Sequence, residues 1–267
     1  MFWTRLVSGI VLLIMAIVFI FVGGLPLWAI SLLISLIGMF ELYRVLKIEK
    51  KAVSWIGYIG AVVYYALLYF KISSEYEVIL FVVMLLLEMV IYVFTFPEYK
   101  TEEITASFFG LFYVAVLFSF LYQTRTLKDG KLLAWLILIS SWGSDTCAYA
   151  VGMLIGKHKV TPKLSPKKSL EGCIGGVCGA ALIAYVYANF VKNYMVEVEN
   201  PLLACTVGCA LGAVVSQIGD LAASAIKRNH EIKDYGNLIP GHGGILDRFD
   251  SMLFTAPIVF FAVMFLG

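Results

Sequence analysis

A series of nine long apolar segments constrains the fold of this chain more than any other feature. Each segment has about 17 to 23 residues, enough for a helix to cross a hydrocarbon core of about 30 Å. The segments lie at 6–22, 26–46, 53–70, 77–96, 104–122, 131–153, 172–191, 201–223 and 249–266. They lack the alternation of apolar and polar residues typical of transmembrane strands. The sequence therefore predicts an all-α, polytopic transmembrane helical bundle of about nine spans.

Composition excludes several other classes of protein. Of the 267 residues, 61% are hydrophobic and 14% are charged, whereas soluble domains are about 45–50% apolar and about 25% charged. A soluble enzyme, a disordered chain and a disulfide scaffold are therefore ruled out. Residues 6–22 could pass for a signal peptide, but no clear cleavage site follows them, so we interpret them as a retained span. We expect one integral membrane domain, 1–267, with N-terminal spans in 1–122 and a catalytic half at about 131–267.

The distribution of basic residues predicts the orientation of the spans. If the N-terminus lies in the cytoplasm, the cytoplasmic side carries about three times as many Lys and Arg residues as the opposite side. Arg5 is counted on the cytoplasmic side. This bias is typical of membrane proteins. Two longer basic loops, 154–171 and 224–248, both fall on the cytoplasmic side. They concentrate Lys, Arg, His, Pro and Gly, so we expect the functional site in these loops. The expected location of the protein is a bacterial inner (plasma) membrane.

Four aspartates lie in or beside the apolar segments. Asp145 lies in the cytoplasmic half of the sixth segment, and Asp220 closes the eighth. Asp247 and Asp250 open the ninth, one helical turn apart. A carboxylate at such depth is costly unless it is paired or binds a cation. The four suit one or two Mg²⁺ ions, which bind one or two carboxylates together with substrate phosphates and water; Asp247 alone could also be a helix N-cap.

The loop 154–171 is a candidate phosphate site. Lys167, Lys168, Ser169 and Glu171 lead into the seventh segment, and lysines with backbone N–H groups at a helix N-terminus can bind phosphate. A polybasic loop can equally serve only to attract anionic lipid head groups. Both interpretations stay open at this point.

The loop 224–250 looks like a binding site rather than a connection. Gly243 and Gly244 beside His242 allow the backbone to approach a ligand closely. Arg248 stands between Asp247 and Asp250 and could hold a phosphate while the aspartates bind metal.

Three of the charged residues in the N-terminal spans need separate interpretation. Glu41 and Arg44 stand at positions i and i+3 and are predicted to pair with each other in a structural role. Glu88 is isolated near the middle of its span, and its role is open.

At these residues the sequence resembles the phosphatidate cytidylyltransferases, also called CDP-diacylglycerol synthases. The signature of that family is matched at Ser224, Lys227, Arg228, Lys233, Asp234, Gly236, Pro240, His242, Gly243, Gly244, Asp247, Arg248 and Asp250. The runs 143–149, 165–169 and 171–176 also resemble family motifs. The motifs cover roughly the C-terminal half, whereas the first five spans match only in hydrophobic character.

The resemblance implies the reaction CTP + phosphatidate → CDP-diacylglycerol + pyrophosphate, with Mg²⁺ as cofactor and a monovalent ion as an option. The implied partners are CTP, phosphatidate and membrane lipids, without nucleic acid, and a homodimer is plausible. The catalytic candidates are Asp220, Asp247, Lys227, Arg228, Arg248 and His242. The candidate metal ligands are Asp145, Asp220, Asp247 and Asp250. The candidate substrate-binding residues are Lys167, Lys168, Ser169, Glu171, Lys233, Gly243 and Gly244.

Two other functions are weighed against this one. A CTP-dependent lipid kinase would use the same nucleotide but transfer its γ-phosphate. An ion-coupled transporter would also carry intramembrane acids, but it would need them along a path to both faces and usually shows internal repeats. The polar groups here gather toward one face, and no convincing repeat is found. A CDP-alcohol phosphotransferase is disfavoured, because its Asp-Gly-x-x-Ala-Arg run is absent.

Overall fold

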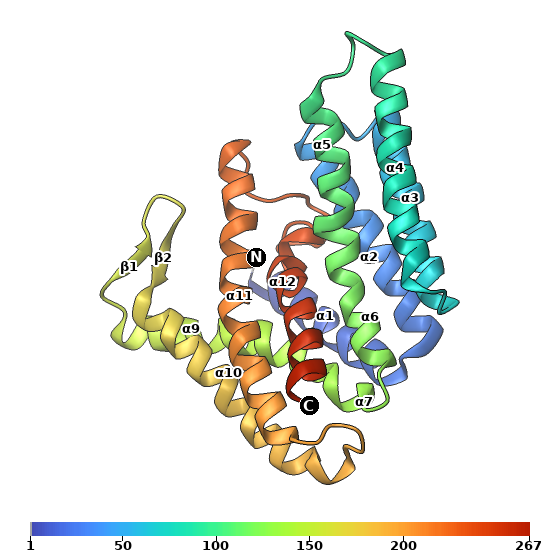
Figure 1. Ribbon diagram of the computed structural model, residues 1–267. Coiled ribbons are helices and arrows are strands. Elements are labelled where there is room, and N and C mark those ends of the chain that lie inside the picture. The colour runs from blue at the N-terminus through green and yellow to red at the C-terminus, as the bar shows by residue number, and fades with distance from the viewer. Residues whose placement is uncertain (1) are drawn as a thin grey trace. The chain divides into compact units, whose positions relative to one another are not determined.

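The computed structural model describes the backbone of residues 2–267 and the side chains of residues 6–267, so Met1 and the side chain of Arg5 lie outside the described part. The chain is almost entirely helical, which confirms the all-α prediction (Figure 1). The first four helices are α1 (Phe2–Val22), α2 (Gly24–Val45), α3 (Ala52–Tyr69) and α4 (Ser74–Phe94). The last three long helices are α10 (Leu170–Val191), α11 (Pro201–Asn229) and α12 (Leu246–Leu266).

Two of the predicted spans are interrupted helices. The fifth is α5 (Thr101–Gly110), a π-helical turn η1 (Leu111–Val116) and α6 (Leu117–Thr126). The sixth is α7 (Gly130–Leu133), α8 (Trp135–Leu138), a second π-helical turn η2 (Ile139–Gly143) and α9 (Ser144–Ile155). In η2 the hydroxyl of Ser141 donates a hydrogen bond of 2.8 Å to the carbonyl of Ile137. Such side-chain bonds to the preceding turn bend helices, and π-turns often accompany functional sites.

The helices have the length and composition of membrane spans. Among the described residues, seven helical stretches are long and apolar enough to cross a membrane, and Leu6–Val22 is a shorter apolar helix. The interrupted segment 130–155 is not among the seven. The chain is therefore a polytopic membrane protein, as its sequence predicts. The cytoplasmic orientation of its loops remains a prediction.

The basic loop after α9 has regular structure that the sequence does not predict. Lys159–Thr161 (β1) and Ser165–Ser169 (β2) pair as a short antiparallel hairpin, with Lys159 opposite Ser169. The amide of Leu170 extends the pairing by donating to the carbonyl of His158 at 2.8 Å. Strands of three and five residues are too short to give a clear period-two pattern. The hairpin places Lys167 and Lys168 on an ordered strand rather than on an irregular loop.

The described residues form two compact units. Unit 1 comprises Met1–Ile14, Gly24–Ser119 and Asp234–Arg248; unit 2 comprises Met15–Gly23, Phe120–Lys233 and Phe249–Gly267. These boundaries differ from the halves expected at 1–122 and 131–267. The expectation of one integral membrane domain remains a prediction.

Unit 1 is built on α2, α3, α4 and α5, which pack side by side (Figure 1). Several tyrosines are buried among these helices. The Tyr43 hydroxyl donates a bond of 2.6 Å to the carbonyl of Ser107, and the hydroxyls of Ser35 and Tyr65 lie 2.9 Å apart. A Cβ atom on Gly57 would lie only 2.3 Å from the Tyr43 hydroxyl, so α3 must carry a glycine there for α2 to pack this closely. The hydrogen bonds between these buried hydroxyls fix α2, which carries Glu41 and Arg44.

In unit 2, helices α9 and α10 pack together through small residues of α10. Along α10 every fourth residue is small and buried: Gly172, Gly176, Ala180, Ala184 and Ala188. This spacing lets α9 and α10 approach closely, as small residues do in membrane helix pairs. A Cβ atom on Gly176 would lie 2.9 Å from the carbonyl oxygen of Ser144. The close pairing fixes α9, and with it Asp145, against the start of α10.

Candidate active site

An ion pair lies at the end of the hairpin in unit 2. The Lys168 ammonium, on β2, lies 2.6 Å from a carboxylate oxygen of Asp220, on α11. The same ammonium lies 3.4 Å from the carbonyl oxygen of Gln217. The two charged side chains are 21% and 32% exposed, so the pair is open to a ligand. The structure thus brings together a predicted substrate-binding lysine and a predicted metal-binding aspartate.

Two further aspartates lie close enough to Asp220 for their charges to repel. Asp145, on α9, interacts unfavourably with Asp220 and favourably with Lys168. Asp250, on α12, interacts unfavourably with both Asp145 and Asp220, and favourably with Lys227. Asp145 is exposed, whereas Asp250 is 7% exposed. Three of the four aspartates singled out in the sequence therefore share one region of unit 2.

The carboxylates of this region suit a divalent cation that takes only some of its ligands from the protein. Among the described residues, no three His, Cys, Asp or Glu side chains are close enough to form a complete metal site. Mg²⁺ typically takes one or two protein carboxylates and completes its shell with phosphates and water. Asp145, Asp220 and Asp250 repel one another, and a cation between any two of them would relieve that repulsion.

A pocket of about 420 Å³ opens beside Lys168. The hairpin contributes Lys159, Lys167, Lys168 and Ser169 to its lining, and α9 contributes Asp145, Tyr149 and Met153; Cys173 and Gln217 complete much of the rest. Its lining is mainly apolar, with the charged groups from the hairpin and Asp145. Such a combination suits a ligand with a phosphate at one end and an apolar body.

Glu171, predicted to bind substrate, holds the base of the hairpin. Its carboxylate lies 2.6 Å from Nδ1 of His158 and accepts the backbone N–H groups of Lys157 and His158. Beside it, the Ser169 hydroxyl caps α10 by accepting the N–H of Gly172 at 3.2 Å. His158 was not singled out in the sequence, because an isolated histidine in a basic loop carries no pattern.

In unit 1, Asp247 organises the loop that precedes α12. One of its carboxylate oxygens accepts the N–H groups of Tyr235 at 2.8 Å and Gly244 at 2.9 Å. Gly243 has a φ of +87°, and a Cβ atom there would lie 2.8 Å from the same oxygen. The glycines of the Gly-His-Gly-Gly run therefore allow the chain to wrap around Asp247.

Glu41 and Arg44 have different partners from the ones predicted. Instead of pairing with each other, both bind the loop 234–248 from α2. Glu41 accepts the N–H groups of Ile245 at 3.1 Å and Leu246 at 2.9 Å. Arg44 donates to the carbonyl of Tyr235 at 2.6 Å. No local sequence signal indicates these contacts, because an acid and a base one turn apart would be expected to pair with each other.

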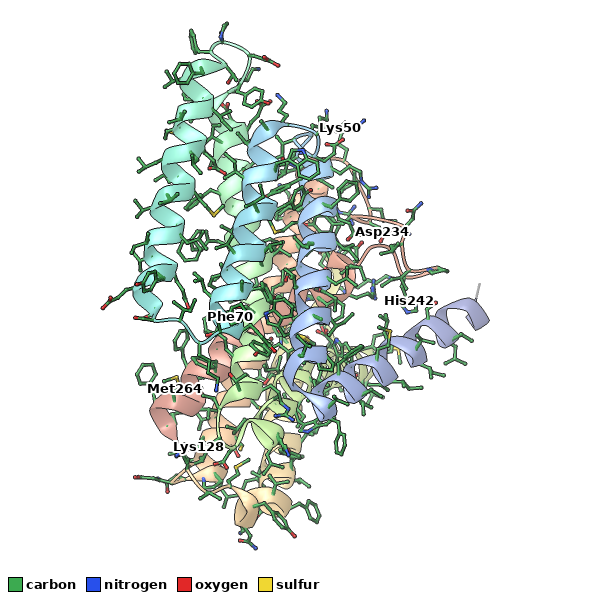
Figure 2. All side chains as sticks on the ribbon, turned by 90° about the vertical axis from the view of Figure 1, so that its right-hand side faces the viewer. Lys50, Phe70, Lys128, Asp234, His242 and Met264 are labelled. Atoms are coloured by element: carbon green, nitrogen blue, oxygen red, sulfur yellow. The ribbon has the colours of Figure 1, made fainter. Side chains whose placement is uncertain are left out.

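The remaining predicted residues lie around these two regions. His242 lies on the loop beside α1, where a Cβ atom on Gly9 would be 3.8 Å from its Nε2 (Figure 2). Asp234, at the start of the same loop, is exposed (Figure 2). Arg228 and Lys233 are exposed, and Arg248 is half-buried. Asp247 and Arg248 belong to unit 1, and Asp145, Asp220 and Asp250 to unit 2, so a shared metal centre remains a prediction.

The fold and the pocket together describe a helical membrane protein with charged groups suited to phosphorylated ligands. The chain belongs to the cytidylyltransferase family, whose model matches residues 3–266. It is 33% identical to a phosphatidate cytidylyltransferase of Bacillus subtilis, over 96% of both chains. It is 32% identical to a protein of the same name from Staphylococcus epidermidis, again over 96% of both. A phosphatidate cytidylyltransferase of Staphylococcus haemolyticus is 40% identical over 147 residues, 55% of this chain and 54% of that protein.

Proposed function

We propose that this protein is a phosphatidate cytidylyltransferase, which converts CTP and phosphatidate into CDP-diacylglycerol and pyrophosphate. The observation that carries the proposal is the juxtaposition of the Lys168–Asp220 ion pair with a pocket that combines lysines and an apolar wall. Full-length relatives of that name support it. The chemistry is that of phospholipid biosynthesis at a membrane.

In the proposed reaction, a phosphate oxygen of phosphatidate attacks the α-phosphorus of CTP. The bond between the α-phosphorus and its bridging oxygen breaks, and pyrophosphate leaves with the bonding electrons. Phosphatidate is already an anion at neutral pH, so the protein needs no general base. Catalysis then rests on holding two polyanions together and neutralising their charge.

The side chains divide between two tasks in this proposal. Lys167, Lys168 and Ser169 bind phosphate groups at the pocket. Lys227 and Arg228, in unit 2, and Arg248, in unit 1, are further cationic residues proposed to bind phosphate. His242 and Lys233 steady the loop or the leaving pyrophosphate. Asp145, Asp220 and Asp250, in unit 2, are carboxylates that would hold Mg²⁺, and Asp247, in unit 1, is a further carboxylate proposed as a metal ligand. When bound, the ion would screen the charge of the phosphates and stabilise the charge that develops on the leaving group.

The proposed setting is the plasma membrane of a bacterium, with the hairpin and the loop 234–248 in the cytoplasm. The excess of Lys and Arg in the loops of that side supports this orientation, and CTP is a cytoplasmic nucleotide. We also propose that the protein forms a homodimer.

The test is the fate of labelled CTP. Purified protein in detergent is mixed with phosphatidate, Mg²⁺ and CTP labelled on the α-phosphate. We expect the label to enter a chloroform-soluble product, pyrophosphate to be released, and both signals to disappear with EDTA. Transfer from γ-labelled but not α-labelled CTP would make the protein a lipid kinase. If folded protein transferred label from neither nucleotide, the proposal would be overturned and an ion-coupled transporter would be the alternative.

Replacing Lys168 with alanine is expected to raise the KM for CTP by about 10-fold or more, because a charge-assisted phosphate contact is lost. The melting temperature should change little, since the Lys168 side chain is partly exposed. Lys163→Ala is the matched control: Lys163 is an exposed lysine of the same hairpin that does not line the pocket. If both variants have the KM of the wild type, the lysines of the hairpin only attract the protein to anionic lipid.

A further inference from the structure

We propose that Glu41, on α2, is a positioning residue that sets the geometry of Asp247 and Arg248 through the backbone of the loop 234–248. The activity measurements that test this proposal rest on the proposed function, whereas the hydrogen-exchange measurement does not. Glu41 is 3% exposed. It lies more than 200 residues from its partners in sequence, in a part of the chain that carries none of the family motifs.

Glu41 binds two backbone N–H groups of the loop at once. Each carboxylate oxygen of Glu41 accepts a different backbone N–H, Oε1 from Ile245 and Oε2 from Leu246. These amides stand at the start of α12, where the first N–H groups of a helix have no partner within the helix. A carboxylate there satisfies two of them and is favoured by the helix dipole. Glu41 therefore fixes the point at which α12 begins, directly before Asp247.

The loop has space for the Glu41 carboxylate only because two of its residues are glycines. A Cβ atom on Gly236 would lie 2.3 Å from Oε1 of Glu41, and one on Gly244 would lie 2.4 Å from Oε2. Neither glycine has a positive φ, so the requirement is space for the carboxylate rather than an unusual backbone conformation. Two glycines of the family signature are thus explained by a residue outside the signature.

The contacts of α2 with the loop form one connected network that includes Asp247. Arg44, one turn from Glu41, binds the carbonyl of Tyr235, and the N–H of Tyr235 binds Asp247. Gly244 donates to Asp247 from the other end of the loop. Asp247 thus takes its orientation from two backbone segments, and α2 holds both. A displacement of about 1 Å at a catalytic group can cost about 100-fold in rate.

The test compares Glu41→Gln with Glu88→Gln. Glu88 is a matched control, because it is a fully buried glutamate in the same unit, on α4. Glutamine keeps the shape of Glu41 but turns an N–H₂ group toward one of the two backbone N–H donors. Hydrogen exchange of residues 235–248 is measured in protein without metal, nucleotide or lipid. The melting temperature, kcat and the KM for CTP are measured in parallel.

For Glu41→Gln we expect exchange of residues 235–248 to rise by about 10-fold or more, and kcat to fall by about 10- to 100-fold with a smaller change in KM. For Glu88→Gln we expect wild-type exchange in this loop and a kcat within about twofold of wild type. Unchanged loop exchange in Glu41→Gln would overturn the proposal. The proposal would also be overturned if kcat fell in proportion to the melting temperature in both variants, because that result indicates general destabilisation.

A second variant and the exchange data cover the cases in which Glu41→Gln does not fold or the protein shows no activity. If Glu41→Gln does not fold, Arg44→Gln removes the second contact of α2 with the loop at a more exposed position. It should raise exchange around Tyr235 and lower kcat in the same direction, and wild-type values for both would overturn the proposal. If the wild-type protein transfers no cytidylyl group, the proposed function fails, while the exchange data still decide whether Glu41 holds the loop.

Discussion

Replacing Asp220 with asparagine is expected to lower kcat for cytidylyl transfer by about 100- to 1,000-fold, the scale for loss of one key electrostatic group in an active site. Asp220 pairs with Lys168 at 2.6 Å and is electrostatically coupled to Asp145 and Asp250. The substitution removes the charge of Asp220 from the candidate cation site and leaves Lys168 without its carboxylate partner. The side chain is 32% exposed, so asparagine fits without repacking.

The measurement is the initial rate with α-labelled CTP at saturating substrate, together with the melting temperature. Glu197→Gln serves as the control for loss of a carboxylate in unit 2, because the ion pair of Glu197 with Lys128 is largely exposed and should contribute little. The double variant with Lys168→Ala tests coupling. If the two residues act as a unit, the double variant will be only slightly worse than Asp220→Asn. Folded Asp220→Asn protein with half of the wild-type rate would remove Asp220 from the proposed catalytic groups.

Replacing Asp247 with asparagine is expected to reduce turnover by about 1,000-fold with only a modest loss of stability. The oxygen that accepts the N–H groups of Tyr235 and Gly244 can be supplied by the asparagine carbonyl. What is lost is the negative charge, which the proposed metal site requires. Asp247→Ala differs, because it leaves two buried N–H groups without that acceptor, at about 1–3 kcal/mol each.

Comparing the two variants separates the effect of losing the Asp247 charge from the effect of losing its hydrogen bonds to the loop. Turnover is followed with labelled CTP, and stability by thermal melting in detergent. We expect both variants to be inactive, with the alanine variant melting clearly below the asparagine variant. An active asparagine variant would show that Asp247 serves only to order the loop, as the cap of a helix would.

The sequence predicted the helical segments well because the membrane requires long apolar runs, and these are local patterns. In unit 2 the structure brings together Lys168, Asp220 and Asp145, three residues that the sequence singled out; their roles remain predictions. The start of α12 was predicted at 249 and lies at Leu246. The additional turn includes Asp247, and its first amides are bound by Glu41.

The contacts of Glu41 and Arg44 could not be predicted for a physical reason. They join residues 204 and 191 positions apart, and nothing local in α2 distinguishes a glutamate that binds a distant loop from one that pairs with the next turn. The hairpin escaped prediction in a similar way. Its strands are too short to show a pattern, and its base is closed by the contact between Glu171 and His158, 13 positions apart.

If Lys167 and Lys168 bind phosphate as proposed, the ordered hairpin lowers the entropy cost of that binding. An isolated two-stranded hairpin is at best marginally stable in water, but this one is closed at its base by Glu171 and continues directly into the capped helix α10. A flexible loop with the same lysines would lose about 1–2 kcal/mol of backbone entropy for each residue that a ligand orders. Here that ordering occurs once, when the chain folds. The attraction between lysine and phosphate is then available as affinity at every turnover.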